Sequence, residues 1–174
     1  EFGEKSKEPM LEVDNVVEAG VLNNVSFKAY GGQILGFAGL VGAGRTEIMR
    51  AVFGADPIDS GKIKIKGKEV HIKSPRQAIH HGIAFLTEDR KGQGLVLAQT
   101  IRTNLILANM KGFSSGLFLN EKKILEAGEQ NIASLRIKTP SIDEIVGQLS
   151  GGNQQKVVIG KWVNTDAEIF IFDE

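Results

Sequence analysis

A glycine-rich segment near position 40 carries the residues best suited to chemistry. It reads Gly39-Leu40-Val41-Gly42-Ala43-Gly44-Arg45-Thr46 and fits the pattern G-x-x-x-x-G-K-[ST], except that arginine replaces lysine. Glycines let backbone N–H groups converge on phosphate oxygens, and a following helix directs the positive end of its dipole to the same place. The segment predicts a phosphate-binding loop, with the Thr46 hydroxyl available to Mg²⁺. The alternative is an accidental glycine-rich turn between a strand and a helix.

Arg45 is the departure from this pattern. Lysine is a compact point charge that can thread back along such a loop, whereas the guanidinium group is planar, bulky and suited to bidentate contacts. Arginine still neutralises phosphate. We therefore expect nucleotide binding to survive at this loop and efficient catalysis to be lost.

An apolar run near the end of the sequence, Ile169–Phe172, leads directly into Asp173 and Glu174. A buried strand that ends beside a phosphate loop would place Asp173 where it can hold Mg²⁺. Glu174 would then be able to orient or deprotonate an attacking water. An apolar strand that ends in two acidic residues is common by itself. Only together with the glycine loop does it indicate a metal-binding and a catalytic carboxylate.

A second glycine-containing segment reads Leu149-Ser150-Gly151-Gly152-Asn153-Gln154-Gln155-Lys156. It precedes a helix that we expect over Gln154–Trp162, so its serine and glycines form a second helix start suited to phosphate. One phosphate loop already serves one triphosphate. The second segment is therefore expected to serve a different nucleotide, carried by a partner. A simple helix cap would explain the serine and glycines but not the polar residues that follow.

Hydrophobic periodicity predicts the elements that position these segments. The run over Gln33–Ala38 lacks alternation, as in a strand buried on both faces. Between Thr87 and Lys161 the pattern is mostly helical, without a convincing strand. We expect strands over 10–17, 21–27, 33–38, 62–66, 70–72, 83–86 and 168–172, and helices over 46–53, 75–81, 120–135 and 154–162.

The helix expected over Asn120–Leu135 has one apolar face, which we assign to Ile124, Leu125, Ile132 and Leu135. Because a central strand with no following helix ends the sequence, we expect the chain to be a fragment of a longer polypeptide.

Composition excludes several classes of function. Lysine plus arginine and aspartate plus glutamate each number 21, so a net charge of zero gives no footprint for nucleic acid. The absence of cysteine excludes disulfides, thiolate zinc sites and cysteine nucleophiles. The most apolar stretch, Ile34–Ala43, is too short to span a bilayer. We assign His71, His80 and His81 to surface or capping roles rather than to a metal.

The order of strand, phosphate loop, helical insertion, Leu-Ser-Gly-Gly and apolar strand with Asp-Glu resembles the nucleotide-binding domain of ATP-binding-cassette (ABC) transporters. Leu149–Gly152 matches the signature motif of that family, with Asn153 in place of its usual glutamine. The resemblance covers 10–174 and implies an α/β P-loop NTPase cassette, here truncated at its C-terminus. It implies a mainly parallel core sheet, an N-terminal antiparallel β-subdomain and an α-helical insertion at about 90–162 that carries the signature.

Three segments are similar to ribose-type bacterial sugar importers: 39–47, 87–91 with 94–97, and 149–157. In that group one ATP-binding polypeptide carries two cassettes, and the chain resembles the second, in which the arginine loop is typical. Residues 1–9, which we expect to be frayed, would belong to the linker. The resemblance implies ATP and Mg²⁺ as ligands. Glu88 occupies the position of a glutamine that touches Mg²⁺ and water, and an aromatic residue that stacks on adenine is missing near Val16. The implied sites are nucleotide contacts at Gly39, Gly42, Ala43, Gly44, Arg45, Thr46, Glu47, Ser150, Gly151, Gly152, Asn153 and Gln154, metal contacts at Thr46, Glu88 and Asp173, and a catalytic Glu174.

The resemblance also implies partners. Cassettes pair head to tail, so Ser150–Gly152 would complete the ATP site of a partner cassette while the chain's own site is degenerate. Asp89–Asn104 would dock on transmembrane permease subunits, which work with a sugar-binding protein at the cytoplasmic face of a bacterial membrane. The full protein would be a sugar-transporting ATPase, and the isolated fragment weak or inactive. The alternatives are a non-catalytic nucleotide-sensing module and a soluble ABC ATPase of DNA repair or translation. The neutral charge and short insertion argue against the latter.

Overall fold

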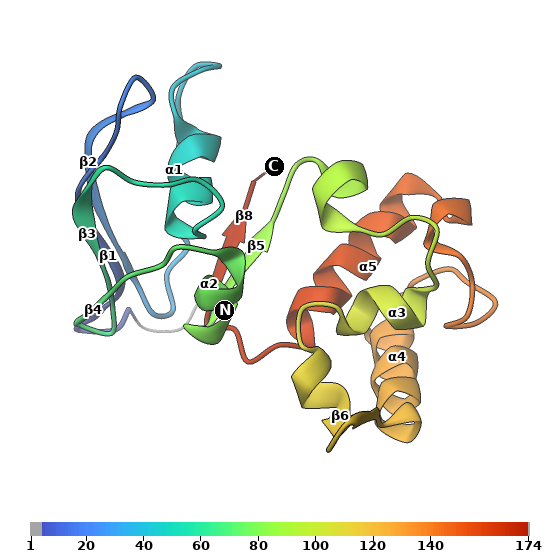
Figure 1. Ribbon diagram of the computed structural model, residues 1–174. Coiled ribbons are helices and arrows are strands. Elements are labelled where there is room, and N and C mark those ends of the chain that lie inside the picture. The colour runs from blue at the N-terminus through green and yellow to red at the C-terminus, as the bar shows by residue number, and fades with distance from the viewer. Residues whose placement is uncertain (1–4, 174) are drawn as a thin grey trace. The chain divides into compact units, whose positions relative to one another are not determined.

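The computed structural model describes residues 5–173. The chain forms two compact units that meet in sequence between Ile83 and Ala84. The first unit contains the phosphate-loop segment, and the second contains the signature segment and most of the helices, as Figure 1 shows by colour along the chain.

The first unit is built from four strands and two short helices. Its elements are β1 (Pro9–Glu18), β2 (Leu22–Tyr30), α1 (Arg45–Val52), β3 (Ser60–Ile65), β4 (Lys68–Val70) and α2 (Pro75–His80). The second unit begins within strand β5. Its elements are β5 (Ile83–Leu86), the π-turn η1 (Arg90–Gly94), α3 (Ile101–Ile106), the 3₁₀ turn η2 (Met110–Phe113), β6 (Ser114–Ser115), β7 (Phe118–Leu119), α4 (Glu121–Leu135), the 3₁₀ turn η3 (Val146–Gln148), α5 (Gly151–Val163) and β8 (Ile169–Phe172).

The strands of the first unit form one antiparallel sheet in the order β2-β1-β3-β4, which confirms the predicted N-terminal antiparallel β-subdomain. Val13 lies in register with Phe27 on one side and with Ile63 on the other. Val13 and Ile63 are buried and alternate with polar neighbours, the pattern that one covered sheet face produces. Ser6 exchanges two hydrogen bonds with Gly31, so this part of the predicted lead-in is tied to the end of β2.

Helix α1 buries Ile48, Met49 and Val52, which form its apolar face. After its last turn, Arg50 holds Asp56 through two hydrogen bonds, Nε to Oδ2 at 2.6 Å and Nη2 to Oδ1 at 2.8 Å. This bidentate pair fixes the chain as it leaves the helix, and it holds the pKa of Asp56 below its usual value.

The strand predicted over Gln33–Ala38 is not formed in the structure. The segment has no ladder partner, and its side chains are open to solvent, with Ile34 75% exposed. A continuous apolar run becomes a buried strand only when neighbouring strands pair with it and other elements cover both faces. Among the described residues that environment is absent, so the prediction of burial is wrong here.

The second unit packs α3, α4 and α5 closely around Gly160. A Cβ atom there would lie 2.8 Å from Cδ2 of Leu105 on α3 and 2.9 Å from Oδ1 of Asn131 on α4. The predicted helix over 120–135 is confirmed, and Asn120 caps it by accepting a hydrogen bond from Lys123 N. Its buried face contains Ile124, Gly128 and Asn131, whereas Leu125 is exposed, so the assignment of Leu125 to that face was wrong.

Two short strands also occur in the helical region. β6 and β7 pair around Gly116, which adopts a left-handed φ of 64°, in a region for which we predicted no strand. Two-residue strands contain too little sequence to show an alternating pattern. β5 and β8 form a two-stranded sheet in which β5 is buried throughout, and Ile171 is the buried residue of β8.

Candidate functional site

The phosphate-loop segment forms a glycine turn that leads directly into α1. Gly42 and Gly44 have left-handed φ angles of 80° and 78°, a conformation that glycine adopts without steric cost. Gly44 is the N-cap of α1 and has no side chain to accept a hydrogen bond from the first turn. A helix start without a capping side chain is an arrangement that suits anion binding.

The first unit positions this turn through β2. A Cβ atom on Gly44 would lie 3.4 Å from Cδ2 of Leu22 and 3.8 Å from the carbonyl oxygen of Val21, so the loop rests on the start of that strand. Leu40 and Val41 at the tip are exposed. The turn is therefore supported by the start of β2 at Gly44 and open to solvent at its tip.

Arg45 runs back over the loop rather than away from it. A Cβ atom on Gly39 would lie 3.8 Å from Cδ of Arg45 and 3.0 Å from Cβ of Ala43. The arginine side chain therefore passes beside the first glycine of the pattern, the course that a phosphate-loop lysine is expected to take. Thr46 and Glu47 follow in the first turn of α1 and are partly buried.

The signature segment forms the start of α5. Ser150 is its N-cap, and the carbonyl oxygen of Ser150 accepts the first hydrogen bond from Gln154 N at 2.9 Å. The Ser150 side chain does not cap the helix, and its Oγ accepts a hydrogen bond from Asn153 Nδ2 at 3.0 Å. Ser150 and Gly152 are exposed, and no atom lies within 4 Å of the position of a Cβ on Gly152. A ligand can therefore approach the backbone closely at Gly152.

Asn153 and Gln154 hold the helix start in place. Oδ1 of Asn153 accepts a hydrogen bond from Lys138 N at 3.0 Å. Gln154 is buried, and its Nε2 donates to the carbonyl oxygens of Val146 and Leu149, each at 3.2 Å. Both side chains thus make contacts within the protein that orient Ser150–Gly152.

Two predicted metal residues lie at the same end of the β5–β8 sheet. Asp173 N donates to the carbonyl oxygen of Leu86 at 2.9 Å, and Glu88 follows Leu86 by two positions. Glu88 is exposed and Asp173 is partly buried. The third predicted metal residue, Thr46, belongs to the first unit. The predicted catalytic residue, Glu174, lies outside the described residues.

Lys161 was missed in the sequence, and it connects α5 to η1. Its side chain is 8% exposed, and Nζ donates to the carbonyl oxygen of Gly94 at 2.6 Å and lies 4.9 Å from the centre of the Trp162 ring. Burial lowers the pKa of Lys161 to about 8. The sequence pattern that could have indicated its burial is a single lysine on the same helix face as the apolar Val157 and Val158.

Asn104 is a second residue that the sequence did not single out. It is fully buried, accepts a hydrogen bond from Val96 N and donates to the carbonyl oxygens of Val96 and Thr100. One side chain therefore satisfies three backbone groups and fixes the shape of the segment between η1 and α3. This segment belongs to the stretch Asp89–Asn104 that we expected to dock on a partner.

Within 5–173, no group of three or more histidine, aspartate or glutamate side chains is placed to hold a metal ion. In the same part of the chain, no helix has the length and apolar character needed to cross a membrane.

Comparison with known proteins identifies the family. A family model described as "ABC transporter" matches residues 22–174. The chain belongs to the ABC transporter family. A nucleotide-free ATP-binding cassette from an ABC transporter superposes with a TM-score of 0.79 at 21% identity and covers 96% of this chain and 69% of that one. The ADP conformation of another such cassette gives 0.76 at 21% identity, covering 94% and 68%. The predicted ABC cassette fold is thus confirmed.

The relatives of this ABC cassette include bacterial import proteins. It is 51% identical to a "putative ribose/galactose/methyl galactoside import ATP-binding protein 3" of Burkholderia cenocepacia, over 95% of this chain and 32% of that protein. It is 47% identical to a similarly named protein of Albidiferax ferrireducens, over 97% and 34%. It is 49% identical to the "ribose import ATP-binding protein RbsA" of Oceanobacillus iheyensis, over 95% and 34%. The chain spans about a third of the length of these curated relatives.

Proposed function

We propose that the chain is the second ATP-binding cassette of a bacterial sugar importer, which couples ATP binding and hydrolysis to inward transport of a monosaccharide. The observation that carries this proposal is the similarity to ribose and galactose import ATP-binding proteins along almost the whole chain. Unlike the fold, which distant cassettes share, a likeness of this degree favours the same class of transported molecule.

The relatives leave room for two cassettes, and one residue favours the second over the first. The relatives are about three times as long as the chain, which leaves room in them for another cassette. Arg45 replaces the phosphate-loop lysine, and the resemblance makes this typical of second cassettes.

The residues of the phosphate loop fit a nucleotide. Left-handed Gly42 and Gly44 and an α1 start without a capping side chain leave backbone N–H groups for phosphate oxygens. Arg45 passes over the loop and would neutralise part of the phosphate charge. Bound Mg²⁺ would stabilise charge on the transferred phosphoryl group, with Thr46, Glu88 and Asp173 as the residues that hold it.

The chain's own site is proposed to turn ATP over slowly. A guanidinium at position 45 favours bidentate contacts over the point contact of an ammonium. It therefore stabilises the bound phosphate but not the transition state of its transfer. Glu88 adds negative charge where a neutral glutamine is usual, which disfavours the developing charge beside it. Glu174 is proposed as the residue that orients the attacking water.

The signature segment is proposed to serve the ATP of a partner cassette in a head-to-tail pair. The supporting geometry is an exposed Ser150, an open approach to Gly152 and the start of a 13-residue helix. Asp89–Asn104 is proposed to dock on permease subunits at the cytoplasmic face of the membrane. The hydrogen bonds of the Asn104 side chain fix the shape of this segment.

Sugar uptake by cells that encode the chain tests this proposal. Ser150→Arg places a bulky cation at the signature and should abolish uptake of labelled ribose or galactose. Ser115→Arg changes an exposed serine of the β6–β7 hairpin in the same unit and should leave uptake unchanged. Unimpaired uptake with the Ser150 variant, or equal loss with both variants, would contradict the proposed role of the signature in transport.

A further inference from the structure

The start of α5 is accompanied by a basic side chain from another element. Arg90 is the first residue of η1, and a Cβ atom on Gly151 would lie 2.9 Å from its Nη2 and 3.5 Å from its Cζ. The guanidinium therefore lies close to the first turn of α5, beside the first glycine of the signature motif.

The turn η1 is closed by its own N-cap and is fixed on α5 at its last residue. Asp89 caps η1 by accepting a hydrogen bond from Gly92 N at 2.9 Å. At the other end, Lys161 donates to Gly94, and a Cβ on Gly94 would lie 3.4 Å from Cγ2 of Val158. The last residue of the turn is therefore held on the helix, and Arg90 reaches from the first residue of the turn to the helix start.

The electrostatics of this arrangement favour an anion. The start of a helix carries about half a positive charge, and a guanidinium adds a full one, so the two repel each other. Within 5–173, no acidic side chain forms an ion pair with Arg90, and Asp89 is engaged with its own turn. A phosphate group would remove the repulsion, because it accepts hydrogen bonds from helix N–H groups and from a guanidinium at the same time.

We propose that Arg90 is a phosphate-binding residue of the signature site. Its guanidinium and the N–H groups of Gly151 and Gly152 together hold the terminal phosphate of a nucleotide carried by the partner cassette. This inference rests on the signature role proposed above and adds a residue to it. Arg90 lies two positions after Glu88, at the start of the proposed permease-docking stretch, so the same turn links that stretch to the partner's nucleotide.

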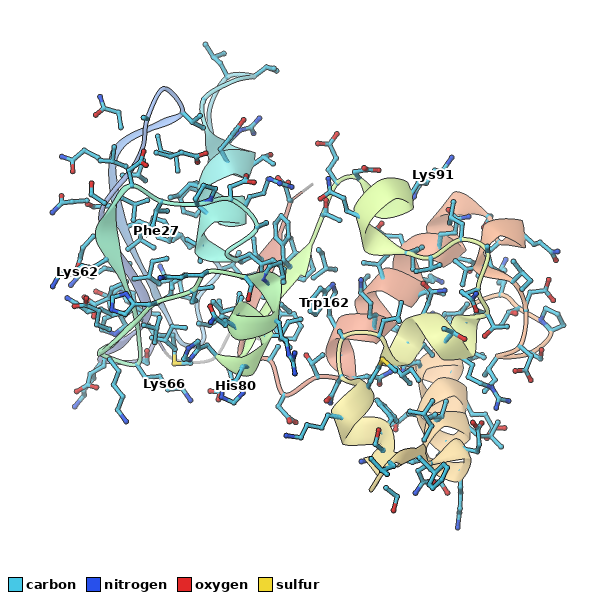
Figure 2. The ribbon with its side chains drawn as sticks, in the orientation of Figure 1. Phe27, Lys62, Lys66, His80, Lys91 and Trp162 are labelled. Atoms are coloured by element: carbon cyan, nitrogen blue, oxygen red, sulfur yellow. The ribbon has the colours of Figure 1, made fainter. Side chains whose placement is uncertain are left out.

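The test measures nucleotide binding to the assembled cassette pair by calorimetry, with a non-hydrolysable ATP analogue and with ADP. Arg90→Ala should weaken binding of the ATP analogue about tenfold or more and leave ADP binding unchanged, because ADP lacks the terminal phosphate. Arg90→Lys keeps the charge without the fork and should give an intermediate loss. Lys91→Ala is the matched control, since Lys91 is the neighbouring exposed basic residue of η1 and Figure 2 shows it projecting outward.

Comparison with Ser150→Arg separates the two proposals. If Ser150→Arg weakens binding of the ATP analogue and both Arg90 variants bind it like the wild type, the role of Arg90 is refuted and the signature role stands. If Ser150→Arg also has no effect, the signature role itself fails. Equal weakening of ATP-analogue and ADP binding by the Arg90 variants would reveal a structural role alone and would overturn the proposal.

Discussion

Lys161→Met should remove a pH dependence from the stability of the second unit. Burial lowers the pKa of Lys161 to about 8 from an ordinary value of 10.5. Below pH 8 the lysine is protonated in both the folded and the unfolded chain. Between pH 8 and 10.5 the unfolded chain binds more protons than the folded chain, so the free energy of unfolding rises with pH in this window.

The size of the effect follows from the difference between the two pKa values. At about 1.4 kcal/mol for each pH unit, the change from 10.5 to about 8 amounts to about 3 kcal/mol, most of which is gained between pH 7 and pH 10. At pH 7 the methionine variant avoids the burial of a charge but loses the hydrogen bond to Gly94, worth about 1.5–3 kcal/mol. We therefore expect similar stabilities at pH 7 and a wild type about 2.5 kcal/mol more stable than the variant at pH 10.

Urea unfolding followed by tryptophan fluorescence measures this difference. Trp162 is the single tryptophan of the sequence and lies beside Lys161, so it reports on the second unit. Lys122→Met, which replaces an exposed lysine of α4, is the control and should change stability equally at both pH values. The reasoning is refuted if the wild type and Lys161→Met differ by the same free energy at pH 7 and pH 10.

Three further changes test other parts of the structure. Gly61→Ala should destabilise the first unit by about 2 kcal/mol or more in urea unfolding, because φ is 104° and the new Cβ would lie 2.6 Å from the backbone of Val16. Gly67→Ala is the control, and with free space around its Cβ it should cost about 1 kcal/mol. Equal costs would show that the contact at Gly61 is relieved. Asn104→Leu should cost about 2 kcal/mol and speed amide exchange at Val96, because it removes the partner of Val96 N and one partner each of the Val96 and Thr100 carbonyl oxygens. Unchanged exchange would contradict this. Arg50→Met should raise the pKa of Asp56 to its usual value or above in a carboxyl NMR titration, because burial then acts alone. It should also remove a stabilisation that the wild type has at neutral pH and loses as the pH falls through the lowered pKa, and an unmoved titration would refute the pairing.

Local patterns in the sequence predicted the first two strands and helix α2. The strands expected over 10–17 and 21–27 pair around Gly20, whose φ of 79° suits a turn, and the helix expected over 75–81 begins at Pro75 after the N-cap Ser74. These features depend on neighbouring residues alone, so local sequence patterns are enough to predict them. The strand expected over Gln33–Ala38 depends on partners elsewhere in the chain, and no local pattern reports whether those partners are present.

In the candidate site, too, local motifs were predictable from the sequence and contacts between distant residues were not. The glycine loop and the signature are continuous motifs, and each forms the helix start that its residues predict. The contact of Arg90 with Gly151 and that of Lys161 with Gly94 join residues about 60 positions apart. Such pairs are set by the packing of η1 on α5, which periodicity does not encode.

Calorimetric titration of the purified 174-residue chain with MgATP, together with a phosphate-release assay on the same sample, tests the central claim most directly. The account predicts saturable binding of the nucleotide at the Arg45 loop without sustained release of phosphate. Sustained hydrolysis by the chain alone would contradict the degenerate site, and failure of a folded sample to bind MgATP would contradict the phosphate loop itself.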